Sequence, residues 1–309
     1  MKYTKPPLTF PEQADLLLSR GLQADRDDLI QKLQSVNYYR FSGYLYPFRQ
    51  ADDTFRPGTT LEIVWSRYTF DRQLRLLIMD AIERVEVAIR TQLTYHFAHT
   101  CGPFAYLDPA NFPGLKNEDH VKWLGELSEE ILRSKEPFVT HFREKYGDSH
   151  SDLPIWMVAE VMSFGKVLTM FRGVSPDLQK KIANEYSIPD EVMRSWLLAL
   201  NTIRNICAHH GRLWNRELGN KPKMPNIRKY PAWHQPVAIG NKRVFGILTI
   251  LHYLLIKISP LNFWHNRLIT LLNSYPNIPK KDMGFPENWE QSPFWQGVSN
   301  LNKTNTKKQ

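Results

Sequence analysis

A helical pattern of apolar residues runs for about forty residues, from just after Thr60 to about His99. Its apolar positions are Leu74, Leu77, Ala81, Val85 and Ala88, beside Ile78, Ile82 and Ile89. A helix of this length is expected to be the scaffold on which the other elements pack. Alternating strand patterns are almost absent from the chain, so we predict an all-α helical bundle.

Residues that start and stop helices recur along the rest of the chain. Two short helices, predicted at residues 11–20 and 25–39, form an additional N-terminal pair. Further helices are predicted at residues 118–133, 155–171, 176–186, 189–210, 241–258 and 261–274. These elements divide the chain into an N-terminal helical subdomain packed on the core (1–58), a main helical domain (59–299) and a polar tail (300–309).

A long loop at residues 211–240 precedes the C-terminal helices, because four prolines there exclude a regular helix. The segment from Arg212 to Arg243 carries eight basic residues and a single acidic one, Glu217. Cations and aromatic faces together suit single-stranded RNA, where stacking contributes ~1–3 kcal/mol per base. The candidate RNA-binding residues are Arg212, Trp214, Arg216, Lys221, Lys223, Arg228, Lys229, Lys242 and Arg243. The alternative is a solvated, disordered loop whose tryptophans pack into the core.

Composition is consistent with a nucleic-acid partner. The net charge of +9 and a pI near 9.4 favour a polyanion on electrostatic grounds. Cys101 and Cys207 have no CxxC neighbour, which argues against a cysteine-built zinc site and fits a reducing, cytoplasmic setting. The apolar stretch at residues 244–258 is shorter than the ~20 residues of a membrane span, so we expect a buried helix and no membrane contact.

The segment at residues 195–216, SWLLALNTIRNICAHHGRLWNR, is the most informative about chemistry. Trp196, Leu200, Ile203 and Cys207 form the buried stripe of a helix, and Asn201, Asn205 and His209 form a second, polar stripe. Arg204 lies roughly 140° around the helix from His209, so one straight helix cannot easily aim both at one atom. Either the helix end bends or two protomers share the site.

These residue types suit the cleavage of RNA. RNA carries its own nucleophile, the 2′-hydroxyl, so a nuclease without a metal needs proton transfer and stabilisation of the phosphorane charge. His209, with His210 beside it in the last helical turn, can transfer protons, and Arg204 can pair with phosphate oxygens. Asn205 can orient either group. An Arg-x(4–6)-His spacing alone is weak evidence, because Arg90/His96, Arg143/His150 and Arg228/His234 show it as well.

RNICAHHGRLWNR resembles the RN-x(3)-H signature of HEPN ribonucleases in the Abi-like family of phage-defence proteins, of the AbiD and AbiF type. Three more segments are similar to that family: NYYRFSGYLYPF, FDRQLRLLIMDAIERVEVAIRTQL and PIWMVAEVMSFG. The resemblance implies a HEPN-type helical fold and a homodimer that brings two Arg/His sets together. It also implies RNA cleavage without metal or cofactor, and growth arrest on infection. Restraint by a structured noncoding RNA, in the manner of a toxin and its antitoxin, is a further implication, and tRNA is a candidate substrate.

Several positions have more than one interpretation. Arg204 and His209 have the structural alternative of an ion pair and a helix cap. Glu160, alone in IWMVAEVM, is expected to be buried and to pair with a cation, with Arg204 as a candidate partner and catalytic support as the other possibility. The aromatic cluster at residues 38–48 is either core or a stacking platform. The competing function is a non-catalytic RNA-binding regulator that uses the same basic surface.

Overall fold

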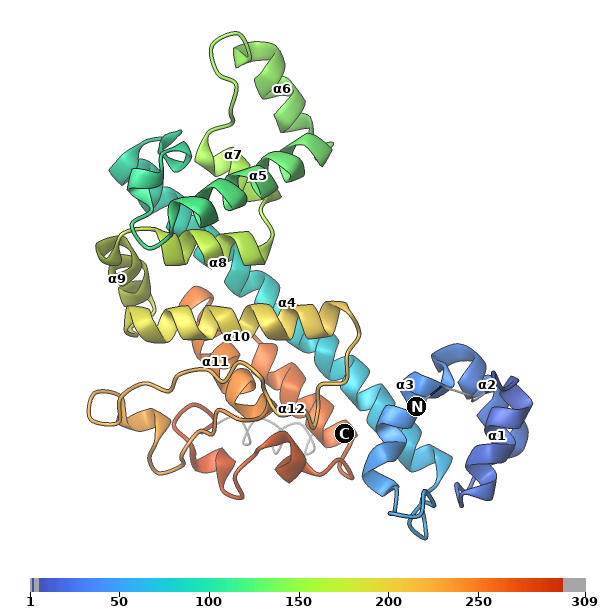
Figure 1. Cartoon of the computed structure of the whole chain (residues 1–309). Helices are drawn as coiled ribbons and strands as arrows, with labels where there is room; N and C mark the ends of the chain where they lie inside the picture. Colours follow the sequence, from blue (N-terminus) through green and yellow to red (C-terminus); the bar gives the residue numbers. More distant parts are fainter. Residues whose placement is uncertain (1, 3–5, 297–309) are drawn as a thin grey trace, which may run out of the picture. The chain divides into compact units, whose positions relative to one another are not determined.

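The computed structural model describes residue 2 and residues 6–296 (Figure 1). Within these residues the chain forms twelve α-helices joined by loops and short 3₁₀ turns, with two isolated β-bridges and no strand. The prediction of an all-α fold is therefore confirmed. The polar tail predicted at residues 300–309 lies outside the described residues.

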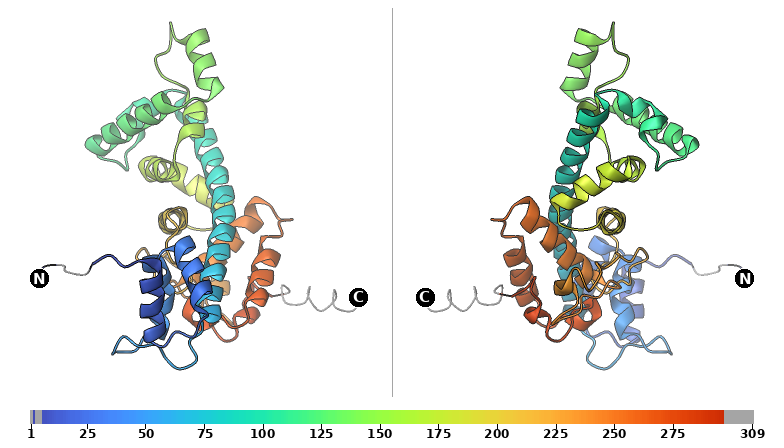
Figure 2. Two further views of the ribbon diagram at one scale, coloured as in Figure 1. Left: turned by 90° about the vertical axis from the view of Figure 1, so that its right-hand side faces the viewer. Right: turned by 90° about the vertical axis from the view of Figure 1, so that its left-hand side faces the viewer.

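Helix α4 (Leu61–Cys101) is the longest element and runs unbroken in both views of Figure 2. Its predicted apolar stripe is buried from Leu74 to Ile89 at most of the positions named above. The described residues divide into two compact units, and α4 contributes to both. One unit holds the chain up to Leu76 with Thr270–Pro279, and the other holds Leu77–Ile269 with the chain from Lys280 onward. This division falls inside α4, whereas the sequence placed a boundary at residue 58.

The first unit contains the predicted N-terminal pair, α1 (Phe10–Ser19) and α2 (Arg26–Val36). The helix predicted at residues 25–39 is interrupted, because a separate α3 (Tyr38–Leu45) begins after Asn37. Asn37 adopts φ 71°, a left-handed conformation that asparagine tolerates better than most residues. Its side chain also accepts a hydrogen bond from the Tyr39 N–H, so one residue ends α2 and caps α3.

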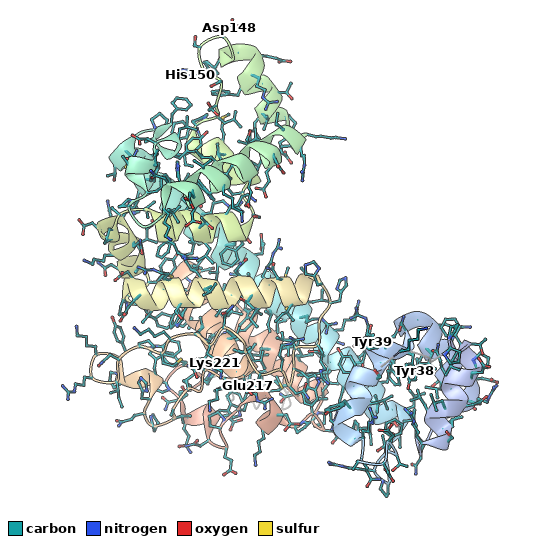
Figure 3. The ribbon with its side chains drawn as sticks, in the orientation of Figure 1. Tyr38, Tyr39, Asp148, His150, Glu217 and Lys221 are labelled. Carbon is teal, nitrogen blue, oxygen red and sulfur yellow. The ribbon has the colours of Figure 1, made fainter. Side chains whose placement is uncertain are left out.

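The aromatic cluster at residues 38–48 is divided between core and surface. Phe41 and Tyr44 are buried, whereas Tyr39 is 87% exposed and Tyr46 is 67% exposed. Figure 3 labels Tyr39 among the side chains of α3. The core interpretation is therefore confirmed for Phe41 and Tyr44, and the stacking platform stays a prediction for the exposed Tyr39 and Tyr46.

Tyr44 belongs to a buried polar group that joins α3 to α4. Its hydroxyl donates to Asp71 over 2.7 Å, and Asp71 forms an ion pair of 2.6 Å with Arg75. Burial and the adjacent Asp71 carboxylate raise the pKa of Tyr44, which keeps the hydroxyl protonated as a donor. The carboxylate thus receives two hydrogen bonds in place of water.

The second unit holds most of the remaining helices. They are α5 (Asn117–Arg133), α6 (Pro137–Tyr146), α7 (Ile155–Val161), α8 (Phe164–Gly173), α9 (Pro176–Glu185), α10 (Asp190–Ala208), α11 (Val244–Ile258) and the first part of α12 (Trp264–Ser274). Helix α6 was not predicted. Of its ten residues, only Val139 and Phe142 are buried. A helix with so small an apolar face shows little of the apolar repeat by which helices are predicted from sequence.

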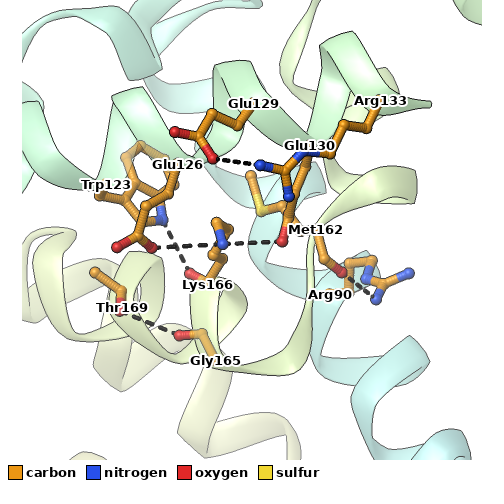
Figure 4. A network of polar contacts seen from close by, with 10 residues as sticks. All are labelled: Arg90, Trp123, Glu126, Glu129, Glu130, Arg133, Met162, Gly165, Lys166 and Thr169. Atoms are coloured by element: carbon orange, nitrogen blue, oxygen red, sulfur yellow. Dashed lines mark hydrogen bonds and ion pairs between the residues drawn. The ribbon is translucent and has the colours of Figure 1, made fainter.

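The helix predicted at residues 155–171 is two helices, because Met162 and Ser163 adopt extended backbone between α7 and α8. The break exposes the Met162 carbonyl, which accepts a 2.9 Å hydrogen bond from Arg90 of α4 (Figure 4). Just beyond the break, Lys166 forms ion pairs with Glu130 and Glu126 of α5. Burial disfavours the Lys166 ammonium, but the two carboxylates outweigh it and raise the pKa of Lys166.

Helix α11 is the most deeply buried of the helices named here in the second unit, with eleven of its fifteen residues buried. None of the helices in the described part of the chain combines the length and apolar character needed to cross a membrane. His252 of α11 is only 3% exposed and lies 5.1 Å, ring to ring, from His265 of α12. Burial, with a smaller contribution from His265, lowers the pKa of His252 to about 4.

The free energy of unfolding is expected to fall as pH decreases from about 6.5 to 4, in part because of His252. In that window the unfolded chain binds a proton that the folded chain excludes, so the unfolded state is favoured as pH falls. The contribution of this residue approaches roughly 3 kcal/mol below pH 4. Urea denaturation of the wild type and of His252→Gln across this range measures it. The variant should lose less stability on acidification, and parallel pH curves would contradict the expectation.

Candidate functional site

Helix α10 carries the candidate site and has the two predicted stripes. Trp196, Leu200, Ile203 and Cys207 are all buried, so the predicted apolar stripe is confirmed. On the polar side, Asn201 is half-buried and Asn205 is exposed. The helix remains regular to Ala208, and the backbone N–H of His209 still bonds to the Asn205 carbonyl over 3.0 Å.

The C-terminal end of α10 closes immediately after His209. The N–H of His210 donates to the Cys207 carbonyl, and the N–H of Gly211 donates to the Ile206 carbonyl, the two bonds of a Schellman cap. The left-handed position of this cap belongs to His210, at φ 57°, and not to the glycine that follows it. Gly211 instead packs against Ile206, where an added Cβ would come within 3.1 Å of its side chain. His209 and His210 are both exposed at this turn.

Arg204 is half-buried, and its guanidinium interacts with two neighbouring side chains. Its Nη1 donates to the side-chain oxygen of Asn205 over 3.3 Å, as expected for a residue that orients the guanidinium. The second neighbour is Glu86 of α4, whose carboxylate is attracted to both Arg204 and Arg90. Burial raises the pKa of Glu86, and the two guanidinium groups oppose that shift.

The carboxylate beside Arg204 is therefore Glu86, a residue that sequence reasoning missed. Glu86 and Arg90 form an ion pair of 2.6 Å one helical turn apart, with each side chain 15% exposed. Arg90 appeared in the sequence only as a chance Arg-x(5)-His match. A local sequence pattern cannot show that the Glu86–Arg90 pair on α4 lies near Arg204, more than a hundred positions later. Only the tertiary fold brings these residues together.

Glu160 differs from expectation. The sequence predicted a buried carboxylate in need of a cation, but Glu160 is exposed, so the premise of that pairing is wrong. On α7 its backbone position faces solvent while Val158 and Ala159 beside it are buried. Arg204 is accordingly next to Glu86 rather than paired with Glu160.

The loop at residues 211–240 is ordered and contains only one 3₁₀ turn, Pro231–Trp233, so the predicted absence of a regular helix is confirmed. Trp214 and Trp233 are buried, at 0% and 2% exposure. Trp233 packs against Trp196 of α10 with ring centroids 5.0 Å apart. Trp196 in turn donates from Nε1 to the Lys223 carbonyl over 2.8 Å, which fastens the loop to α10. Trp214 was proposed to stack on RNA, but in this structure its ring belongs to the core.

Most of the predicted basic residues remain at the surface. Arg216, Lys221, Lys223, Arg228, Lys229 and Lys242 are exposed, and Arg212 and Arg243 are half-buried. Lys221 pairs with Glu217 over 3.2 Å, both labelled in Figure 3, and Lys223 pairs with Glu191. Such exposed pairs contribute little, so these cations stay available to phosphates. Among the described residues, no group of three or more His, Cys, Asp or Glu side chains is arranged to hold a metal ion.

Comparison with known proteins identifies a family. A protein-family profile described as "Abi-like protein" matches residues 31–215, which is more than half of the chain. The matched range includes α4 and α10, and thus Glu86, Arg204 and His209. Neither a curated protein nor a solved structure matches the chain.

Proposed function

The chain belongs to the Abi-like protein family, and from this premise we propose that it is an endoribonuclease that acts in abortive infection. We assign it more finely to the HEPN ribonucleases of the AbiD and AbiF type. The observation that carries the proposal is the end of α10, where an exposed imidazole, His209, follows a guanidinium, Arg204, that donates a hydrogen bond to Asn205 and is attracted electrostatically by Glu86.

The chemistry needs two proton transfers and stabilisation of charge on phosphorus. The 2′-oxygen of RNA loses its proton and forms a bond to phosphorus, while the bond from phosphorus to the 5′-oxygen breaks and that oxygen gains a proton. His209 serves as acid or base in these transfers, a role worth roughly 10²–10⁴-fold in rate. Arg204 stabilises the negative phosphorane as a permanently charged fork. The products are a 2′,3′-cyclic phosphate and a 5′-hydroxyl.

The arrangement of the two residues supports a site made by two copies of the chain. Because α10 is regular to Ala208, Arg204 and His209 keep their separation of roughly 140° around the helix axis. In the proposed homodimer, Arg204 of one copy and His209 of the partner subunit act on the same phosphodiester.

The proposed substrate is cellular RNA in the cytoplasm, with tRNA loops as candidates because their bases are unpaired and accessible. The exposed cations of the loop at residues 211–240, with Lys242, provide contacts to the phosphate backbone. A structured noncoding RNA that occupies the same surface is the proposed restraint on activity before infection.

The direct test is incubation of the purified chain with tRNA and with an unstructured RNA in the presence of EDTA. We expect cleavage that continues under chelation and leaves 2′,3′-cyclic phosphate ends, detected by end-specific ligation and sequencing. RNA that is bound but stays intact in all conditions would instead favour the second candidate, a non-catalytic RNA-binding regulator with the same basic surface.

A further inference from the structure

A cavity of about 290 Å³ opens where α4 and α7 meet in the second unit. The residues of its wall used here are Arg90, Thr94, Tyr95, His99, Trp156 and Glu160. Its volume is at the lower end of the range for small-molecule sites, which suits one planar ring system rather than a helical duplex. The cavity shares Arg90 with the ion pair beside Arg204 but is otherwise separate from the residues of the proposed catalysis.

Aromatic side chains form much of this wall and remain accessible. Trp156 is 52% exposed and Tyr95 is 57% exposed, although both have large apolar rings. His99 is fixed against Tyr95, since its Nδ1 donates to the Tyr95 carbonyl over 2.8 Å and the two ring centroids are 4.1 Å apart. Accessible, preordered rings at the edge of a cavity are the usual means of stacking an unpaired nucleobase.

The polar residues of the wall match the edge of a base. The exposed Glu160 carboxylate accepts hydrogen bonds, and amino groups of nucleobases are donors that carboxylates recognise. Recognition of a base would therefore explain the exposed carboxylate of Glu160, which is neither buried nor paired with Arg204. The hydroxyl of Thr94 already donates to the Arg90 carbonyl, so its remaining capacity is as an acceptor too.

Arg90 connects the cavity to the candidate catalytic residues. Its guanidinium donates to Glu86 over 2.6 Å and to the Met162 carbonyl over 2.9 Å, and the latter bond appears in Figure 4. Glu86 also interacts with Arg204. The Arg90–Glu86 pair therefore links the two places, because Arg90 lines the cavity and Glu86 interacts electrostatically with Arg204.

We propose that the cavity between α4 and α7 binds one unstacked nucleobase of the RNA strand, by stacking on Trp156 and Tyr95 and by hydrogen bonding to Glu160. This inference rests on the proposed function, because it makes the cavity a recognition subsite for the RNA that is cut. It places recognition on α4 and α7, in addition to the basic loop.

The test measures binding without cleavage. The full chain is titrated into a short fluorescent strand of 2′-O-methyl RNA, whose blocked 2′-oxygen prevents the reaction, and into an abasic strand of the same length. Trp156→Ala is expected to weaken binding to the strand with bases by about 5- to 100-fold, the loss of one stacked base, and to leave the abasic strand unaffected. Trp156→Phe keeps an aromatic face and should recover most of the affinity.

Phe263→Ala is the matched control, because Phe263 is an aromatic residue that is 72% exposed and lies outside the cavity. Its affinity for both strands should equal that of the wild type. Unchanged binding of the base-containing strand by Trp156→Ala would overturn the inference, and so would equal weakening on both strands. A failure of the nuclease proposal would appear separately, as natural RNA left intact by the wild type.

Discussion

Replacement of His209 by alanine is expected to lower the rate of RNA cleavage by about 10²–10⁴-fold while the affinity for RNA stays the same. The imidazole is exposed at the C-cap of α10, where its side chain supports no part of the core, so the fold should survive its removal. The proton transfers to and from the 2′- and 5′-oxygens would lose their catalyst. Single-turnover cleavage of tRNA and equilibrium binding of uncleavable RNA measure the two effects separately.

His141→Ala is the control for this experiment, because His141 is an exposed histidine on α6, outside the candidate site. It should cleave at the wild-type rate. Equal cleavage rates of the His209→Ala variant and the wild type would exclude a catalytic role for His209. The non-catalytic regulator becomes the better account if the wild type itself binds RNA and leaves it intact.

His209→Ala and a second variant, Arg204→Ala, together test whether the site is shared between copies. Arg204→Ala and His209→Ala are each expected to be inactive alone. In a shared site, a mixture of the two contains heterodimers with one intact pair, made by Arg204 of the His209→Ala chain and His209 of the Arg204→Ala chain. Partial recovery of cleavage on mixing would therefore support the dimer, whereas no recovery by chains that exchange subunits would contradict it.

Asp71→Ala is expected to reduce the free energy of unfolding by about 3–5 kcal/mol. The Asp71 side chain is fully buried and Arg75 is 6% exposed, so removal of the carboxylate leaves a guanidinium that is shielded from water. Tyr44 would also lose the acceptor of its 2.7 Å hydrogen bond. Urea denaturation monitored by circular dichroism gives the change.

The double variant Asp71→Ala/Arg75→Met separates the cost of a buried guanidinium that has lost Asp71 from the cost of lost packing. Replacing both charged partners should recover a large part of the stability, because no ion is then left buried. If the double variant is less stable than Asp71→Ala alone, the expectation that an isolated charge dominates is wrong.

The long helix was the most predictable part of the fold. Its apolar stripe repeats over ten turns, and the structure has α4 where that repeat predicts it, from Leu61 to Cys101. Interruptions were missed where they depend on a single residue or on tertiary contacts. Asn37 ends α2 by adopting φ 71°, and the break at Met162 is stabilised by a donor on a different helix, Arg90.

The helix that carries the candidate residues was predictable too, while their catalytic role came from the resemblance and stays a prediction. Arg204, Asn205 and His209 were located on one helix by spacing alone, since three- and four-residue steps define its faces. Their surroundings were not, because Glu86 lies near Arg204 only after α4 and α10 pack. The burial of Trp214 could not be predicted from the sequence either. An aromatic residue among cations gives the same sequence pattern whether its ring contacts RNA or packs in the core.

The attachment of the proline-rich loop to α10 has a thermodynamic consequence for complex formation. Trp196 holds the Lys223 carbonyl and Trp233 anchors the middle of the segment, so the backbone that carries the exposed lysines and arginines is already ordered in the free protein. When a polyanion binds there, side-chain rotamers become restricted but the backbone of the loop does not have to become ordered. Ordering of that backbone on binding would otherwise cost ~1–2 kcal/mol for each residue. Association at this surface should therefore resemble rigid-body docking, with ion release as its main favourable entropy.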